Sequence, residues 1–124
     1  MLEKVKLIVK AAEDKKAEDI IVLDLRNLSS IADYFIICTA GSNTQVRAVV
    51  DHIEETLGKK GHHPARIEGY TVSEWVLMDY IDVIVHVFQP EVRKYYDLER
   101  LWLDAPRIDI EELKEKGVLT GEGR

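Results

Sequence analysis

The chain has very little cysteine: Cys38 is the only one among 124 residues. A single thiol cannot form a disulfide within the chain, which fits a reducing compartment. No apolar run approaches the roughly 20 residues of a membrane-spanning helix. Residues 1–10 alternate charged and apolar side chains and lack the basic and apolar segments of a signal peptide. We therefore expect a soluble, cytoplasmic protein with no membrane contact.

Basic residues are also scarce relative to acidic ones. Lysine and arginine number 17 against 23 aspartates and glutamates, which gives a formal net charge of −6. Domains that coat DNA or bare RNA are usually basic, because phosphate repels carboxylates. An acidic domain is attracted instead to basic proteins. The charge therefore disfavours direct, sequence-specific nucleic-acid binding and favours a basic protein as the partner.

The apolar residues follow helical and strand periodicities in turn. Apolar spacings of three and four residues predict helices, and short β-branched runs predict strands. Ser42 and Gln45 have the spacing of a capping box, and Pro90 suits the first turn of a helix. The expected elements are a helix over 2–16, strands over 20–25 and 34–40, a helix between Ser42 and Gly58, strands over 66–70, 75–80 and 83–88, and a helix from Pro90.

This order of elements predicts an α/β (α+β) fold, with a mixed central sheet of about five strands and flanking helices. No repeat or Pro/Gly/Ser-rich linker interrupts residues 1–106, which are therefore expected to form one domain. Strands 75–80 and 83–88 are close enough to pair as a hairpin. Residues 107–124 are expected to be a charged C-terminal tail, with room for a short helix and with disordered last residues.

Gly41-Ser42 is the first candidate for an active site. Nucleotidyltransferases place a Gly-Ser pair between a strand and a helix to contact a triphosphate, and they also need an Asp-x-Asp pair that holds metal ions. The following strand here offers only Glu68, with Arg66 where the metal should lie, and Asp24 belongs to another strand. The pair therefore indicates an ordinary helix start, with a phosphate site as the alternative.

The remaining reactive side chains form no recognisable constellation. His62 and His63 lie in a turn without the further ligands of a zinc site. His86 has the surroundings of a half-buried histidine with a hydrogen-bond partner, and Cys38 those of an inert buried thiol. No nucleophile elbow, phosphate-binding loop or dinucleotide fingerprint is present. We predict no catalytic residue, no bound metal and no cofactor.

The strand over 75–80 is apolar on both faces. Its odd-numbered side chains Trp75, Leu77 and Asp79 share one face, and the even-numbered ones share the other. One apolar face is enough for a sheet that is covered on one side. The surplus face is therefore either covered by a helix or exposed to a partner. Trp and Tyr beside a carboxylate are typical of an interface hot spot.

The last helix offers a second candidate surface. Arg93, Lys94, Tyr95 and Tyr96 place two aromatic rings beside two cations, a combination that could bridge to a partner. The alternative is that Tyr95 or Tyr96 packs onto the sheet.

A series of short motifs runs through the chain in a defined order. They are Asp24-Leu25-Arg26, Ala32 to Cys38, Gln45-Val46, Glu68-Gly69, Trp75-Val76-Leu77, Asp79-Tyr80, Asp82-Val83, Val85 to Phe88, Tyr95-Tyr96-x-Leu98-Glu99-x-Leu101-Trp102 and Asp104-Ala105-Pro106. The series closely resembles the ribosomal silencing factor family, also called RsfS or Iojap-like. No single motif is specific alone, but the ordered set, which covers residues 1 to about 106, is highly specific.

The resemblance implies a nucleotidyltransferase-like scaffold without its active site. It also implies a translational repressor that binds the large ribosomal subunit and blocks joining of the small subunit when nutrients are short. The implied partner is large-subunit ribosomal protein number fourteen, on the intersubunit face. The contact residues that it implies, together with those of the last helix, are Trp75, Val76, Leu77, Asp79, Tyr80, Arg93, Lys94 and Tyr95.

One departure from the family pattern lies in the turn after Asp79-Tyr80. The family often carries glycine there, and this chain carries Ile81. A β-branched residue disfavours a positive φ angle. We therefore expect a hairpin turn of a different shape, which could change the direction of Tyr80.

An interaction protein is the leading hypothesis, and two other classes remain open. A nucleotidyltransferase-like enzyme acting on a nucleotide or an RNA end would bind nucleotide at Ser42 and Mg²⁺ near Asp24 and Glu68. A direct RNA binder is disfavoured by the charge and by the lack of an Arg/Lys-aromatic platform. An apolar surface can also self-associate, so a homodimer is a further possibility.

Overall fold

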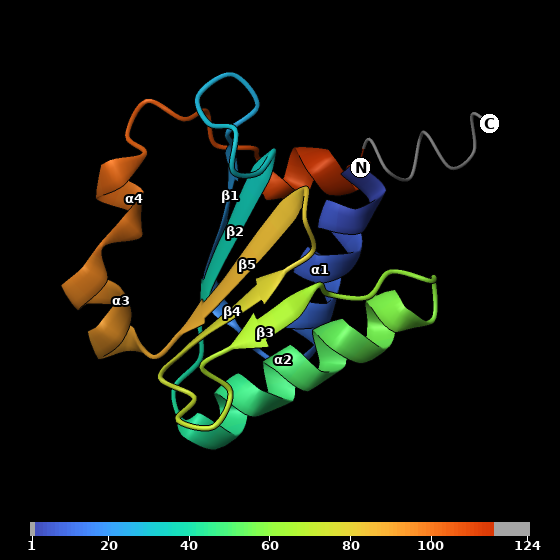
Figure 1. Cartoon of the computed structure of the whole chain (residues 1–124), viewed down its shortest axis with the longest axis vertical. Helices are drawn as coiled ribbons and strands as arrows, with labels where there is room; N and C mark the ends of the chain where they lie inside the picture. The colour runs from blue at the N-terminus through green and yellow to red at the C-terminus, as the bar shows by residue number, and fades with distance from the viewer. Residues whose placement is uncertain (1, 116–124) are drawn as a thin grey trace.

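Five strands form one mixed sheet in the computed structural model, which describes residues 2–115 (Figure 1). The order across the sheet is β1-β2-β5-β4-β3. β2 and β5 pair in parallel, and the other three pairs are antiparallel. The strands are β1 (Glu18–Asp24), β2 (Tyr34–Thr39), β3 (Arg66–Glu68), β4 (Trp75–Asp79) and β5 (Val83–Phe88). This arrangement confirms the predicted mixed sheet of about five strands.

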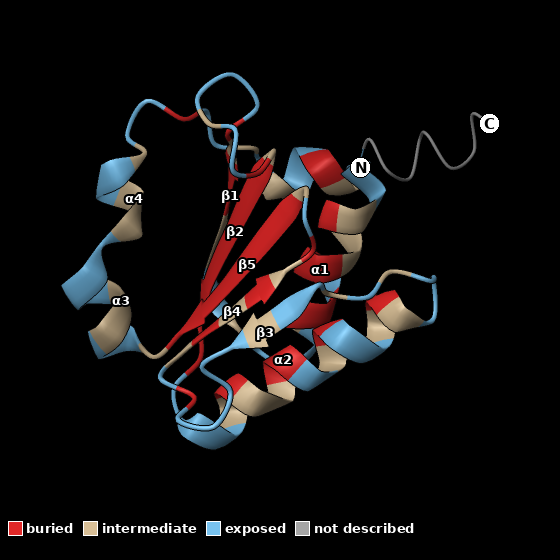
Figure 2. Cartoon of the chain, viewed as in Figure 1, coloured by how far each residue is buried: buried red, intermediate tan, exposed pale blue. Residues whose placement is uncertain are grey.

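Helices lie against both faces of the sheet. α1 (Leu2–Asp14) and α2 (Asn43–Gly58) cover one face, and the short α3 (Pro90–Tyr96) and α4 (Leu98–Leu101) lie beside the other (Figure 1). β2 and β5 are buried along their whole length because they lie between these layers (Figure 2). Their nearly continuous apolar sequences fit strands that are covered on both faces. We call the face beneath α1 and α2 the inner face, and the other the outer face.

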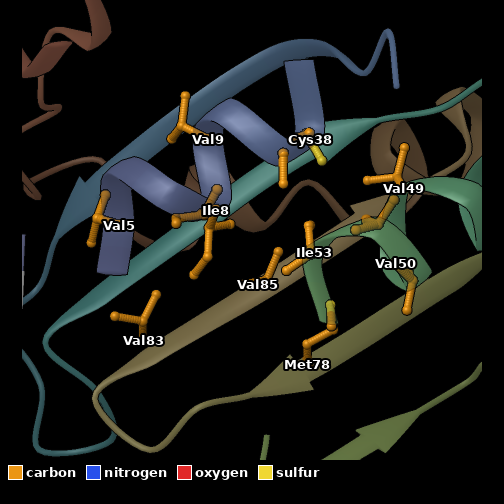
Figure 3. Packing of buried hydrophobic residues seen from close by; sticks show 14 of the residues in the cluster. Val5, Ile8, Val9, Cys38, Val49, Val50, Ile53, Met78, Val83 and Val85 are labelled. Atoms are coloured by element: carbon orange, nitrogen blue, oxygen red, sulfur yellow. The ribbon is translucent and has the colours of Figure 1, made fainter. Parts of the chain in front are cut away.

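The inner face holds the larger apolar cluster. Side chains of α1 and α2, among them Val5, Ile8 and Ile53, meet Val85 of β5 and Cys38 of β2 (Figure 3). A second cluster fills the outer face, between the sheet and the segment that contains α3 and α4. Each face of the sheet thus has its own apolar cluster, which is the arrangement expected for helices on both sides of a sheet.

The start of α2 confirms the capping prediction with one difference. The Ser42 Oγ accepts a hydrogen bond from the Gln45 N–H over 3.1 Å. The Gln45 Oε1 accepts from the N–H of Gly41 over 2.6 Å, one residue before the position of a standard capping box. The Gln45 Nε2 also donates to the carbonyls of Lys15 and Lys16, so the same side chain joins α2 to the turn that follows α1.

The β4–β5 turn overturns the prediction made for Ile81. This residue has a φ of 77°, the region that glycine favours, so the turn keeps the backbone conformation that we expected it to lose. Three hydrogen bonds hold it there: Ile81 N–H to Asp79 Oδ1, Asp82 N–H to the Tyr80 carbonyl, and Tyr80 N–H to the Val83 carbonyl. The Ile81 side chain is 68% exposed, so little of the rest of the protein packs against it, and the strain of the positive φ lies in its own backbone.

Residues 107–115 pack as part of the domain and not as a separate tail. The Ile108 N–H donates to the carbonyl of Val22 on β1, and Leu113 is buried in the inner cluster. Lys114 forms an ion pair of 2.9 Å with Glu13 of α1. Residues 110–115 are helical, at the place where a short helix was expected. The predicted disorder of the last residues concerns 116–124, which lie outside the described residues.

None of the helices within residues 2–115 combines the length and the apolar character needed to cross a membrane.

Candidate functional site

β4 divides its side chains between the two faces of the sheet. Trp75, Leu77 and Asp79 are half-buried on the outer face, while Val76 and Met78 are fully buried against the inner layer. The outer side of β4 is therefore neither fully covered by a helix nor fully open. We call Trp75, Leu77 and Asp79 the β4 outer face.

Two of the predicted contact residues lie in the core. Val76 belongs to the inner cluster, and Tyr80 is only 3% exposed, with its pKa raised by burial. The period of two along a strand sends even-numbered positions inward once the odd-numbered positions face outward. The prediction that Val76 and Tyr80 contact a partner directly therefore needs correction: on this surface they can only support the strand.

Trp75 lies in an aromatic cluster that joins β4, β5 and α3. Its ring centroid is 4.8 Å from that of Phe88, which faces it in the β4–β5 register, and 4.7 Å from that of Tyr96. The indole N–H of Trp75 donates to Nδ1 of His86 over 3.1 Å. The tryptophan is thus held from the sheet below and from α3 beside it.

The turn before β4 comes close to the tryptophan. Gly69 has a φ of +85°, and a Cβ at this position would collide with the carbonyl oxygen of Trp75. Only glycine fits this close approach. Beside it lies a shallow hollow of about 160 Å³, lined by Gly69, Val72, Glu74, Trp75, Val92 and Tyr96. This volume is well below the roughly 300–1,000 Å³ of most small-molecule sites, so the hollow suits a single protein side chain better than a substrate.

Asp79 brings a carboxylate to the edge of this apolar area. Its Oδ1 accepts a hydrogen bond from the Ile81 N–H in the β4–β5 turn, and its Oδ2 lies 3.4 Å from Nε of Arg66 on β3. Arg66 also contacts Glu68 over 3.2 Å. The Arg66 side chain is 60% exposed in both pairs, so water screens its charge and each pair contributes little stability. Asp79 can therefore exchange Arg66 for a cation of a partner at small cost.

Arg93 points toward the sheet and not toward solvent. Its Nη1 donates to the hydroxyl of Thr39 over 2.7 Å and to the carbonyl of Asp19 over 2.8 Å, and its Nη2 pairs with Glu99 over 2.9 Å. Its side chain is only 12% exposed. The prediction that Arg93 contacts a partner directly therefore needs correction, because its guanidinium already bonds to Thr39, Asp19 and Glu99. Arg93 instead joins α3 to the sheet.

The exposed side of α3 continues the surface of β4. Lys94 is exposed, and Tyr95 is 81% exposed. The ring of Tyr95 lies 5.1 Å from that of Tyr96, which in turn packs on Trp75. The two surfaces that were predicted separately are thus one continuous aromatic surface, and Tyr96 is the residue that links them. Its position beside Tyr95 was noted in the sequence, but only the fold places it against Trp75.

The carboxylates considered for metal-dependent chemistry lie far apart in the sheet. Asp24 is on β1 and Glu68 on β3, which are the two edge strands. Asp24 is paired with Arg26 over 2.7 Å, and the hydrogen bonds from this guanidinium lower the pKa of its carboxyl group. Within residues 2–115, no three His, Cys, Asp or Glu side chains gather as a metal site would require. Burial raises the pKa of Cys38 to about 12, so the thiol stays protonated.

A comparison with family models assigns the chain. The family described as ribosomal silencing factor during starvation matches residues 1–120. The chain belongs to this family. The match covers all of α1 and extends past Leu113, so the family unit includes the packed C-terminal segment. Membership supports a ribosome-associated role in translational silencing.

Individual relatives agree with the assignment. A ribosomal silencing factor RsfS from Halalkalibacterium halodurans is 43% identical over 109 residues, which cover 88% of this chain and 93% of that protein. A crystal structure of a Chromobacterium violaceum protein has a TM-score of 0.79 at 44% identity and covers 81% of this chain and 83% of that chain. A more distant mouse relative, 27% identical over 77% of this chain and 43% of that protein, is named mitochondrial assembly of ribosomal large subunit protein 1.

Proposed function

We propose that this protein represses translation by binding the large ribosomal subunit through the β4 outer face. The partner is a basic protein of the intersubunit face, large-subunit ribosomal protein number fourteen. Once bound, the domain occupies volume that the small subunit must enter. The observation that carries the proposal is the half-buried Trp75 and Leu77 beside Asp79, on the one side of β4 that no helix fully covers.

The chemistry of this surface suits a basic protein. An aromatic anchor in a packed setting is the usual centre of an interface, and its truncation typically costs about 2 kcal/mol or more of binding free energy. Asp79, Glu68 and Glu74 add carboxylates around the apolar centre, next to Arg66. The net charge of −6 also attracts a basic partner over longer distances and mainly raises the association rate. Association should therefore slow as salt is added, more than dissociation accelerates.

Blocking subunit joining requires occupancy and no reaction. The separation of Asp24 and Glu68 on opposite edge strands supports a function without metal-assisted phosphoryl transfer. Incubation with each nucleoside triphosphate and Mg²⁺ should release no pyrophosphate above background. Release that an Asp24→Asn or Glu68→Gln change abolishes would instead establish the nucleotidyltransferase-like alternative.

The direct test places a positive charge in the middle of the β4 outer face. Leu77→Arg repels a basic partner, and its long side chain can extend to water, so the fold should persist. Thr44→Arg is the matched control, because Thr44 is exposed on α2 and the change adds the same charge on the opposite face. We expect Leu77→Arg to lose co-sedimentation with purified large subunits and to stop inhibiting subunit joining, with Thr44→Arg unaffected.

Two outcomes would contradict the proposal. One is a folded Leu77→Arg protein that binds large subunits and inhibits joining as the unmodified chain does. The other is inhibition that does not increase with the fraction of large subunits occupied, because a steric block depends on occupancy alone.

A further inference from the structure

His86 is a polar residue in the middle of the apolar outer cluster. It lies on the central strand β5, between Ile37 of β2 and Leu77 of β4 in the strand registers, and it is only 3% exposed. Its ring centroid is 4.7 Å from that of Phe35 and 6.1 Å from that of Phe88. Every one of these neighbours is apolar, so an apolar side chain would pack here as well as an imidazole does.

The imidazole makes one hydrogen bond in the described part of the chain, to the indole of Trp75. Its Nδ1 accepts the indole N–H, so the proton of the neutral ring lies on Nε2. Nε2 is buried and has no hydrogen-bond partner within residues 2–115. A buried polar group without a partner is destabilising, and such groups in folded proteins call for an explanation. Burial also lowers the pKa of His86 to about 4, which keeps Nδ1 available as an acceptor at neutral pH.

The other contacts of Trp75 allow its ring to turn. Phe88 stacks on it with an interplanar angle of 27°, and Tyr96 packs against it at 48°. Stacking fixes the plane of the ring but not the edge that carries the N–H, so these contacts tolerate a flipped indole. The hydrogen bond to His86 is the contact that selects one orientation, because it requires the indole N–H to point at Nδ1.

We infer that His86 is a positioning residue: it fixes the orientation of the Trp75 indole and so prepares the β4 outer face for its partner. The inference rests on the proposed function, because it assigns Trp75 to the interface. A ring that is already held in its bound orientation loses less freedom on association, which increases affinity without any new contact.

His86→Leu removes the acceptor and puts an apolar side chain of similar size in its place. The chain has two tryptophans, so its indole N–H region in a nitrogen-edited NMR spectrum should contain two signals, and Trp75→Phe assigns one of them. We expect His86→Leu to shift the Trp75 indole signal and to accelerate its hydrogen exchange. The affinity for large subunits should fall about five- to tenfold, as for the loss of one hydrogen bond, without a lower melting temperature.

Two further variants separate positioning from a general packing effect. His86→Asn places an amide oxygen near the position of Nδ1, and it should restore part of the indole signal and of the affinity. In the Trp75→Phe background the indole N–H is absent, so adding His86→Leu should not weaken binding further. An unchanged indole signal in His86→Leu would overturn the inference, and so would an equal loss of affinity in both backgrounds.

The same experiment distinguishes this inference from the proposed function. An unmodified chain that does not bind large subunits would overturn the proposed function, and with it the binding part of the inference. The indole signal would still decide whether His86 orients Trp75. Normal binding by a His86→Leu protein with a displaced indole would leave the proposed function intact and overturn the role of His86 in binding.

Discussion

The guanidinium of Arg93 donates a hydrogen bond of 2.7 Å to the hydroxyl of Thr39, which joins α3 to the end of β2. The same guanidinium bonds to the carbonyl of Asp19 in β1 and to the carboxylate of Glu99 in α4. α3 has no fully buried residue of its own. The arginine therefore contributes a large part of what holds α3, and with it Tyr96, against the sheet.

Replacing Arg93 should destabilise the fold much more than replacing its neighbour. Arg93→Ala leaves the half-buried Glu99 without its cation, and we expect a loss of about 2–4 kcal/mol in the free energy of unfolding. Lys94→Ala removes an exposed cation from the same helix and should change the free energy of unfolding by less than about 0.5 kcal/mol. Urea unfolding of the two variants measures both effects. Similar losses in the two proteins would show that Arg93 does not anchor α3.

The backbone at Ile81 should be relieved by glycine. A β-branched residue at φ 77° is strained by about 1–2 kcal/mol, whereas glycine adopts this region freely. Glycine also increases the entropy of the unfolded chain, which offsets part of this gain. We therefore expect Ile81→Gly to raise the free energy of unfolding by about 1 kcal/mol. Ile81→Ala keeps a Cβ and should gain less. A lower urea midpoint for Ile81→Gly than for the unmodified chain would argue against strain at this turn.

The thiol of Cys38 should be unreactive in the folded protein. It is fully buried on β2, and burial raises its pKa to about 12, so almost no thiolate forms at pH 8. A thiol reagent that gives a coloured product should label Cys38 only as fast as the protein unfolds. A Cys38→Ala chain with Ser30→Cys, in the exposed β1–β2 loop, is the reactive control. Rapid labelling of Cys38 in native buffer would contradict its placement.

The burial of His86 predicts a loss of stability on acidification. Its pKa is about 4 in the folded chain, against an ordinary value of 6.5. The unfolded chain therefore takes up a proton at this residue before the folded chain does. The stabilisation is fully present above pH 6.5, falls as the pH drops through 6.5 toward 4, and amounts to about 3 kcal/mol in total.

His86→Leu lacks this titration and provides the comparison. Other ionisable groups are shared by the two proteins, so the difference between their unfolding free energies isolates the histidine. From pH 7.5 to pH 4.5, the unmodified chain should lose about 2 kcal/mol more than His86→Leu. Parallel stability curves for the two proteins would show that His86 is not buried in its neutral form.

Local spacing was enough to predict most of the elements. Ser42 and Gln45 marked the start of α2, Pro90 lies in the first turn of α3, and the runs that became β4 and β5 pair as the expected hairpin. These signals depend on residues within one turn of a helix or one strand, where backbone preference and apolar period act directly. The resemblance to the family also rests on short motifs of this kind and is confirmed by the family match.

The candidate surface was predicted only in part, because sequence signals report on neighbouring residues and not on contacts between distant ones. The alternation along β4 separated Trp75, Leu77 and Asp79 from Val76 and Tyr80, but it could not show which set packs beneath α1 and α2. The sequence could equally not show that Arg93 turns inward to Thr39 while Tyr95 remains exposed. These outcomes depend on contacts between residues that are distant in the chain.

The sequence by itself determined the periodicity of each element, the absence of a disulfide framework, the acidic charge and the family motifs, because each of these depends on composition or on neighbouring residues. The tertiary structure alone decided the order of the strands, the face that α1 and α2 cover, the packing of residues 107–115 and the pairing of Trp75 with His86 and Tyr96. Burial depends on how all the helices and strands pack together. A strand that is apolar on both sides has an inner and an outer face only once the helices have packed against the sheet.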